Sequence, residues 1–210
     1  MPYTIWLIPA LTTFSEALAL AASRELDVEF NDMKSGYRIR TAGNQLYADV
    51  YLYDSLSSGA GYAGRVTDFI DPVMRKMEEI MKNCSCSNAC PNCLQHFGNQ
   101  REKENLDRYL GIDFLNFVRD GKMKTIIEKK EQQYYFVELN KIANLHGMSS
   151  IISENSDRFY LNSSSGSKEI TVYPSMCNIS GFEGDGKIYL SDRMCKYAIS
   201  EIWRTLQDKL

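Results

Sequence analysis

The sequence predicts an α+β protein, with a small mixed sheet packed by helices around a loop of four cysteines and a smaller α/β unit after it. Segments with helical and with strand-type hydrophobic patterns occur in both parts, which is typical of this class. Four of the six cysteines fall within ten residues, 84–93. A polar, lysine-rich stretch at 122–130 separates the two parts, so we predict domains at 1–122 and 123–210.

Length and composition indicate an ordinary soluble globular protein, with material for one good core or two small ones. The chain has 210 residues, of which 44% are hydrophobic, and a net charge of −3. Because the chain as a whole is acidic, it could bind nucleic acid only through a local basic patch.

The N-terminus imitates a secretory signal but lacks its charge pattern. No lysine or arginine precedes Arg24, Pro9 interrupts the apolar run, and Glu16 lies inside it. The chain also has no uninterrupted apolar segment long enough to span a bilayer. Clustered cysteines of the metal-binding type favour a reducing compartment, so we expect a cytoplasmic protein without membrane contact.

A T-x-x-E capping box formed by Thr13 and Glu16 predicts the start of the first helix. Apolar residues then recur at helical spacing as far as Leu26. The segments 28–30 and 37–40 alternate like half-buried strands, and 34–36 is predicted as the turn between them.

Residues 46–53 are almost continuously β-prone, which predicts a central strand. A helical stripe extends from Val66 to Met81, and Asp71-Pro72 in its middle predicts a kink or two separate helices. After the cysteines, another stripe at 106–118 predicts a helix that ends at Gly121.

The second unit is predicted to begin with a helix at 126–146, closed by Gly147. Strands are predicted at 149–152, 158–161, 170–173 and 187–190, with a serine-rich hairpin tip at 163–167. Ser191 or Asp192 then caps a final helix, with Met194, Ala198, Ile202 and Leu206 on its buried face.

The four clustered cysteines form one C-x-C pair and one C-x2-C pair: Cys84, Cys86, Cys90 and Cys93. Two such pairs complete a tetrahedral site, and a site with no open position is structural and not catalytic. The pattern therefore predicts a Zn²⁺ loop. An iron–sulfur cluster is the main alternative, and disulfides are disfavoured because so tight a cluster would strain them. His96 lies near enough in sequence to replace a cysteine, but four thiolates suffice.

Other candidate sites have weaker support in the sequence. Gly59-Ala-Gly61 before a helix suits either an anion or a tight turn, and Asp54 suits either a metal or a turn cap. The segment 181–187 matches the phosphate-loop pattern G-x4-G-K in letters only. Ile188 stands where magnesium needs Ser or Thr, and a strand follows, so we expect no bound nucleotide.

The remaining ionisable residues form no complete catalytic set. Two histidines, His96 and His146, leave little material for histidine chemistry, and Cys177 and Cys195 are expected to be buried. The best basic collection is interleaved with acidic residues, which indicates a mixed solvated face. Its members are Arg101, Lys103, Arg108, Lys122, Lys124, Lys129 and Lys130.

Three landmarks in order resemble the MrfA Zn-binding (MZB) domain family over residues 14–120. They are the helix Ser15–Asp27, the segment Leu52–Ala63, and Cys84–Leu94 together with Asn105–Arg108. Ser58-Gly59 stands where this family usually has two glycines.

The resemblance implies a helicase context. Domains of this family occur at the C-terminus of superfamily 2 DNA helicases and in DrmB-like anti-phage defence proteins. It implies zinc ligation by the four clustered cysteines and a superfamily 2 helicase subunit or domain as partner. The chain has no Walker A lysine–threonine pair and no Walker B box, so we expect no catalytic activity of its own.

Three functional hypotheses follow. The first is a non-catalytic, zinc-stabilised accessory module that binds DNA or the motor subunit in DNA repair or anti-phage defence. The second is a protein-binding scaffold that never contacts nucleic acid, which the acidic composition favours. The third is a metal-dependent hydrolase of nucleic acid that uses Asp54 and the glycine loop.

Overall fold

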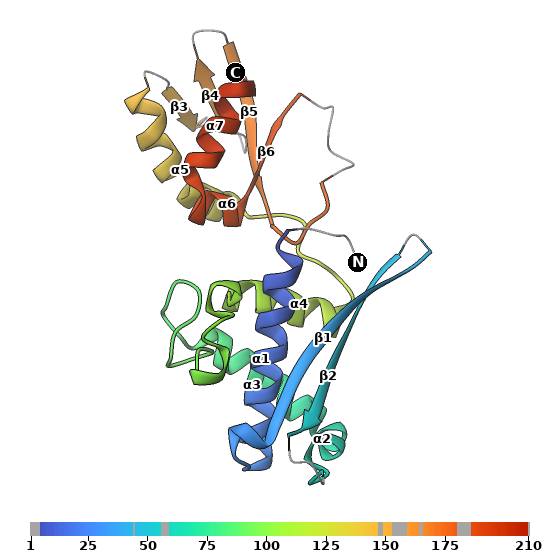
Figure 1. Ribbon diagram of the computed structural model, residues 1–210. Coiled ribbons are helices and arrows are strands. Elements are labelled where there is room, and N and C mark those ends of the chain that lie inside the picture. Colours follow the sequence, from blue (N-terminus) through green and yellow to red (C-terminus); the bar gives the residue numbers. More distant parts are fainter. Residues whose placement is uncertain are drawn as a thin grey trace. The chain divides into compact units, whose positions relative to one another are not determined.

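The computed structural model describes residues 5–43, 45–55, 59–146, 149–152, 159–163, 166–179 and 186–209. The chain forms two compact units, unit 1 at Met1–Met123 and unit 2 at Lys124–Leu210. Both combine helices with small sheets, so the α+β prediction is confirmed (Figure 1). Among the described residues, every helix is too short or too polar to cross a membrane.

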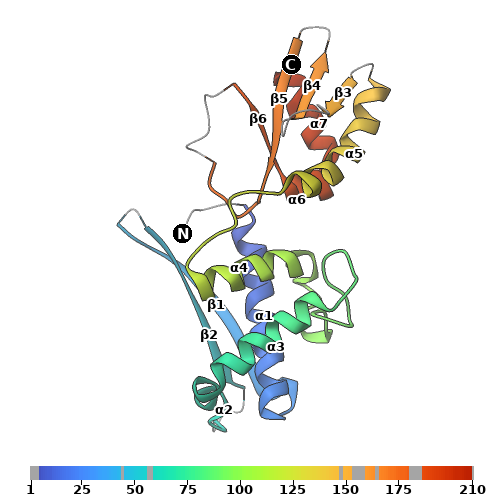
Figure 2. The ribbon, with the colours of Figure 1, turned by 180° about the vertical axis from the view of Figure 1, so that it is seen from behind.

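Unit 1 places one long helix against two others and a β-ribbon (Figures 1 and 2). Its elements are α1 (Leu7–Leu26), η1 (Phe30–Asp32), β1 (Met33–Ala42), β2 (Gln45–Asp54), α2 (Tyr62–Arg65), η2 (Val66–Phe69), α3 (Ile70–Lys82), η3 (Phe97–Asn99), η4 (Lys103–Asn105) and α4 (Arg108–Asp120). Helix α1 contacts α3, α4 and β1, and it is buried on most sides. Its alanines allow this close approach because they add little volume to the helix surface.

Helix α1 begins six residues before the predicted capping box, at Leu7, so that prediction is wrong. Pro9 is accommodated because the first turn of a helix needs no backbone N–H donor. Thr13 lies fully buried inside the helix. Its hydroxyl accepts from the backbone N–H of Asp107 at 2.8 Å and donates to the Asn105 carbonyl at 3.3 Å. The T-x-x-E letters therefore serve tertiary contacts.

Strands β1 and β2 form an antiparallel two-stranded ribbon, in which Met33 pairs with Asp54 and Ala42 with Gln45. A strand at 46–53 is confirmed, but its central position is wrong, since β2 pairs only with β1 in the described part of the chain. The predicted turn at 34–36 lies inside β1, and 28–30 is not a strand. One face of the ribbon is hydrogen-bonded to α1. Ser35 Oγ donates to the Ser15 carbonyl at 2.6 Å, and the hydroxyls of Tyr37 and Thr12 lie 3.1 Å apart.

The helical stripe at 66–81 is divided, as predicted, into η2 and α3, and α2 lies before it. The last helix starts at Ile70, so Pro72 occupies its first turn and costs no hydrogen bond. Its buried face is formed by Val73, Met77, Ile80 and Met81, whereas Ile70 is exposed.

Helix α4 is capped by Asp107, whose carboxylate accepts from the N–H groups of Tyr109 and Leu110. It ends at Gly121 in the left-handed conformation (φ 69°), as predicted. The rings of Phe14 and Phe114 meet edge to face at 5.0 Å, which joins α4 to α1.

Unit 2 contains one four-stranded sheet with helices, in the order β3-β4-β5-β6. Its elements are α5 (Lys129–Leu145), β3 (Ser149–Ile152), β4 (Phe159–Ser163), β5 (Gly166–Tyr173), β6 (Ile188–Ser191), α6 (Asp192–Tyr197) and α7 (Ile199–Lys209). Strand β6 is parallel to β5, and the other pairs are antiparallel. Its core includes Phe136, Leu139, Leu161, Val172 and Ile202.

The predicted strands of unit 2 are confirmed, and β4 and β5 are antiparallel neighbours as a hairpin requires. The predicted tip at 163–167 is too wide, because Ser163 pairs with Gly166 and both are strand residues, and 164–165 lie outside the described residues. Helix α5 starts later than predicted, at Lys129, and the final helix is divided at Ala198 into α6 and α7. Ser191 is the cap of α6, accepting from Met194 N at 3.4 Å. Gly147, Arg158 and 181–185 lie outside the described residues.

Candidate metal centre

The cysteine loop connects the end of α3 to η3 and is fixed to the core at both ends. Met81 before it and Leu94 after it are at most 1% exposed. Between them, Cys84, Cys86 and Cys90 are partly exposed and Cys93 is buried. The loop is therefore held on the surface of unit 1 by its two flanks.

The four sulfur atoms lie within 4.8 Å of one another. The distances are 3.5 Å between Cys84 and Cys90, 3.7 Å between Cys86 and Cys93, and 3.8 Å between Cys90 and Cys93. A tetrahedral ion with metal–sulfur bonds of about 2.3 Å sets its ligands about 3.8 Å apart. The donors thus fit one zinc ion, and all six cysteines are free, which excludes the disulfide alternative.

The C-x2-C half of the loop is shaped by one carbonyl. The oxygen of Cys90 accepts from the backbone N–H groups of Cys93, Leu94 and Gln95 at 3.0 to 3.1 Å. The N–H of Cys90 in turn points at Cys93 Sγ at 3.2 Å. Such a turn brings two sulfurs to the same side, and its N–H donor stabilises negative charge on a thiolate.

The thiols of the cluster differ in acidity. Hydrogen bonds from Cys86, first from its backbone N–H, lower the pKa of Cys84 to about 7. Burial beside the other thiols raises the pKa of Cys86 to about 12, and burial also raises that of Cys93. Four neighbouring thiolates would repel one another, and a bound cation offsets this repulsion. The four thiols are therefore suited to a bound metal.

Arg108 holds the loop from behind, although the sequence grouped it with solvated cations. Its side chain is buried and donates to the carbonyls of Cys86 at 3.0 Å and Met81 at 2.9 Å. Its backbone N–H reaches the Asn88 carbonyl at 2.9 Å. One residue at the start of α4 thereby connects the loop to the end of α3.

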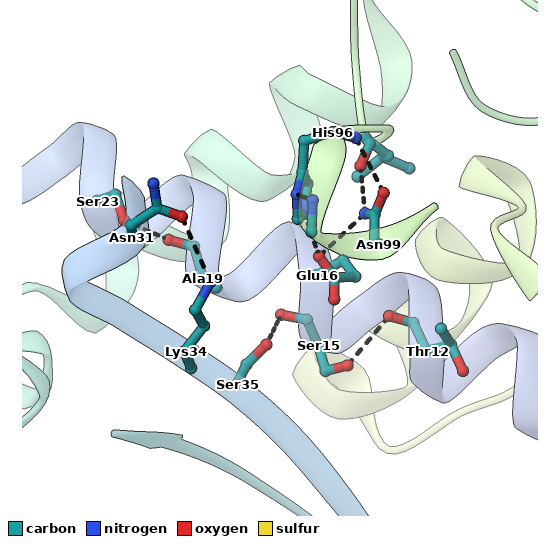
Figure 3. Close-up of polar contacts among 12 residues, drawn as sticks. Thr12, Ser15, Glu16, Ala19, Ser23, Asn31, Lys34, Ser35, His96 and Asn99 are labelled. Carbon is teal, nitrogen blue, oxygen red and sulfur yellow. Dashed lines mark hydrogen bonds and ion pairs between the residues drawn. The ribbon is translucent and has the colours of Figure 1, made fainter. Parts of the chain in front are cut away.

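His96 is a clamp between the loop and α1 and does not ligate the cluster. Figure 3 shows the side chains of Glu16, His96 and Asn99 converging. Nδ1 of His96 accepts from Gly98 N at 3.1 Å, so Nε2 carries the proton that is shared with Glu16 at 2.7 Å. Asn99 donates to the same carboxylate at 3.1 Å. Both ring nitrogens of His96 are therefore occupied by contacts within the protein.

Asp54 caps the turn before α2. Its two carboxylate oxygens accept from Gly61 N at 2.7 Å and Ala63 N at 2.9 Å. These are the N–H groups that an anion would use, and the carboxylate also repels anions. The turn interpretation of the glycine loop, with Gly59 and Gly61 at positive φ, therefore accounts for the observed contacts.

The other sequence candidates are structural. Cys195 is buried as expected, whereas Cys177 is only partly buried. In unit 2, Ser175 contacts the Ser191 hydroxyl at 2.6 Å and donates to Asp192, forming a buried polar link between the end of β5 and the start of α6. No histidine takes part in this described cluster, so it carries no catalytic triad.

Comparison with known proteins identifies the first part of the chain. Residues 14–94 match the model of the MrfA Zn-binding domain, MZB. The matched segment contains all four cysteines of the loop. Residues 14–94 therefore carry an MZB domain. Because the family is a zinc-binding one and the sulfurs fit a single tetrahedral ion, zinc is the cofactor of this chain.

Two curated relatives extend the comparison. Druantia protein DruE of Escherichia coli (strain UMEA 4076-1) is 35% identical over 147 residues, which is 68% of this chain and 8% of that protein. The matched share exceeds unit 1, so the similarity extends into unit 2. The uncharacterized protein MJ1572.1 of Methanocaldococcus jannaschii is 28% identical over 83 residues, 38% of this chain and 74% of that protein.

A solved structure, the DUF1998 helicase MrfA bound to DNA, is similar over 55% of this chain and 15% of its own length. The identity is 19% and the TM-score 0.43.

Proposed function

We propose that this chain is a non-catalytic, zinc-stabilised accessory module of a DNA helicase, which binds DNA or the motor subunit in the cytoplasm. Its zinc ligands are Cys84, Cys86, Cys90 and Cys93. The process it serves is anti-phage defence or DNA repair. The observation that carries the proposal is the closed set of four sulfurs inside an MZB domain.

A closed thiolate site has no coordination position for a substrate, so its contribution is to stability. The loop contacts the end of α3 and the start of α4 through Arg108, and α1 through the His96 clamp. Zinc that holds the loop therefore holds the three helices of unit 1 in register. Function then belongs to the surfaces of this scaffold.

The helicase context is supported by the match of residues 14–94 to the MrfA Zn-binding domain. This chain spans 8% of DruE, so a small part of that protein corresponds to it. The identity of the motor and of the process is part of the proposal.

Zinc analysis tests the central claim. Protein purified without chelator is expected to contain one zinc per chain by plasma mass spectrometry, and chelation should lower the melting temperature sharply. A zinc-free, folded chain would refute the proposal.

The helicase claim is tested by adding the zinc-loaded chain to a superfamily 2 helicase encoded beside it and measuring DNA-stimulated ATP hydrolysis. An unchanged rate and no complex by light scattering count against it.

The net charge of −3 favours a second candidate, a protein-binding scaffold without nucleic-acid contact. A DNA titration at several salt concentrations separates the two, because phosphate contacts give a steep negative salt slope. The hydrolase hypothesis loses its main residue, since both oxygens of Asp54 serve as a cap. Labelled DNA incubated with Mg²⁺ or Mn²⁺ is expected to stay intact.

A further inference from the structure

The β1–β2 ribbon has two chemically different faces, because side chains alternate along each strand. The inner face contacts α1 through Ser35 and Tyr37. The opposite side, here called the outer ribbon face, carries Lys34, Gly36, Arg38 and Arg40 from β1 and Tyr47, Asp49, Tyr51 and Tyr53 from β2. In the register, Arg40 lies opposite Tyr47, Arg38 opposite Asp49 and Gly36 opposite Tyr51.

Three tyrosine side chains of the outer ribbon face are open to solvent. Tyr47 is 39% exposed, Tyr51 50% and Tyr53 47%. The rings of Tyr51 and Tyr53 lie 6.2 Å apart. Exposed aromatic rings on alternate residues of one strand are unusual on a surface that contacts only water. Rings at this spacing can each stack on one base of a nucleic acid.

Gly36 fixes one of these platforms. A Cβ at Gly36 would lie 2.7 to 2.9 Å from the phenol end of Tyr51, so the ring lies directly across the glycine on the neighbouring strand. Because Gly36 has no side chain, the Tyr51 ring can lie directly against the β1 backbone. Because the ring is already placed, stacking a ligand on it costs little conformational entropy.

The same face concentrates positive charge. Two guanidinium groups, Arg38 and Arg40, stand against one carboxylate, Asp49, although the whole chain has a net charge of −3. The ammonium of Lys34 is directed to η1, where it donates to Asn31 Oδ1 at 3.5 Å and lies 5.5 Å from the centre of the Phe30 ring. Asp49 accepts from Arg38 at 3.2 Å and from Arg40 at 2.9 Å, and the Arg40 guanidinium lies 4.7 Å from the centre of the Tyr47 ring. This is the local basic patch that an acidic chain needs to bind a polyanion.

We propose that the outer ribbon face binds single-stranded nucleic acid, with bases stacked on Tyr51, Tyr53 and Tyr47 and phosphates held by Arg38 and Arg40. The combination of rings and cations matches the two components of sequence-tolerant single-strand recognition. An apolar protein partner fits less well, because the outer face carries no Leu, Ile, Val, Phe or Met. The proposal deepens the proposed function by naming the surface and the form of the nucleic acid.

The test is a binding titration of a fluorescein-labelled oligothymidylate with the full chain. Fluorescence anisotropy measures the affinity. The double variant Tyr51→Thr/Tyr53→Thr removes two rings but keeps good strand formers, so the ribbon persists. Because two stacking rings are lost, its affinity is expected to fall by about thirtyfold or more. Tyr53→Phe keeps the ring and should bind like the wild type. The control Tyr134→Thr alters a tyrosine on α5 that is 75% exposed and should leave affinity unchanged.

Phosphate contacts are tested by salt dependence. Arg38→Gln should reduce the slope of log K against log salt by about 0.7, the value for one contact with a single strand. Lys141→Gln removes a cation on α5 of similar exposure and should leave the slope unchanged. A matching duplex is expected to bind more weakly than oligothymidylate, since paired bases offer no free faces to the rings.

Several results would overturn the proposal. They are no binding of oligothymidylate at low salt, equal affinity of the double threonine variant, preference for duplex, or self-association that the threonine changes abolish. Zinc content measured on the same samples separates the two claims. A zinc-loaded chain that binds no oligothymidylate overturns only the ribbon proposal, whereas a folded chain without zinc overturns the proposed function.

Discussion

Arg108 shows how a single side chain determines the position of the metal loop. A guanidinium has donors in a fixed planar arrangement, so it can satisfy several carbonyls at once. Here it bonds the carbonyls of Met81 and Cys86 and contacts the hydroxyl and ring of Tyr109. The guanidinium of Arg108 is buried among these internal contacts, so Arg108 is not part of an external basic surface.

Replacing Arg108 with methionine should lower the free energy of unfolding by about 2–4 kcal/mol, because two carbonyls lose their donor in a buried place. Lysine, with one ammonium group, should restore only part of this. Urea denaturation measures both variants. Arg65→Gln, at an exposed position on α2, is the control and should change stability by less than about 0.5 kcal/mol. Equal stability of R108M and wild type would contradict the assigned role.

Each of the four clustered cysteines is predicted to be needed for zinc. Cys90→Ser should lose most of the bound metal and lower Tm by at least about 10 °C, since Tm shifts by about 4–8 °C for each kcal/mol in a small domain. Metal analysis and thermal unfolding measure the two effects. Cys177→Ser, outside the cluster, should keep its zinc. Full zinc retention in C90S would show that the ligand set is wrong.

Helix packing in unit 1 depends on small residues at the crossing points of α1, α3 and α4. Gly111 weakens the helical pattern of α4 in sequence, yet it is buried where the three helices meet. A Cβ there would lie 2.6 Å from Met81 Sδ and 2.7 Å from Thr13 Cγ2. Thr13 cannot move aside easily, since its hydroxyl is hydrogen-bonded to the turn before α4.

Gly111→Ala is therefore expected to destabilise the protein by about 1–2 kcal/mol, the overpacking cost less the gain in helix propensity. The matched control is Gly64→Ala in α2, where an added Cβ meets no atom within 4 Å. That change should be neutral or slightly stabilising. Thermal unfolding of both proteins measures the difference. A G111A protein as stable as G64A would show that the crossing has room to spare.

An ion pair also joins two helices of unit 1. Glu78 on α3 accepts from Lys82 and, at 3.0 Å, from Arg119 on α4. The hydrogen bond from Lys82, followed by that from Arg119, lowers the pKa of Glu78 below its ordinary value of 4.5. A carboxyl with a lowered folded-state pKa adds stability above its unfolded pKa, and this stability disappears as pH falls through the folded pKa.

Glu78→Gln should consequently lower Tm at neutral pH and have no effect well below pH 4.5, where the wild-type carboxyl is also protonated. The effect at neutral pH should be under about 1 kcal/mol, because the pair is partly exposed. Melting curves across this range, with Glu201→Gln on an exposed part of α7 as control, measure it. A Tm difference that is constant with pH would contradict the assignment.

At the scale of the whole molecule, each unit has a hydrophobic core of its own. In the described part of unit 2, the core is built from residues between Ile127 and Leu206. The metal loop belongs entirely to unit 1. That the units are separately folding domains stays a prediction, and it has a thermodynamic signature.

Calorimetry of the zinc-loaded chain should show two transitions, of which only one shifts when chelator is added. The shifted transition belongs to unit 1, since metal that binds only the folded state stabilises the unit that holds it. Cys90→Ser should move the same transition without chelator. One cooperative transition that moves as a whole on chelation would show that the two units unfold together.

Several features that depend on near neighbours in the chain were predicted correctly, whereas those that depend on distant residues were not. Gly121, the division near Pro72 and the cysteine loop were predictable because each depends on neighbours a few residues away. The roles of Thr13 and His96 were not, since their partners lie more than 79 residues away in the chain. The capping-box letters favoured a helix start, but burial against η4 and α4 determined the actual contacts.

By itself, the sequence determined the α+β class, the zinc-binding character and the position of the cysteine loop, because donor type and spacing alone define a tetrahedral thiolate site. Only the tertiary structure decided that Arg108 is internal and that Asp54 is a cap, since both depend on which backbone groups lie nearby. It also gathered tyrosines and cations of two strands on one ribbon face. Strand register, which pairs residues far apart along the chain, is the physical reason.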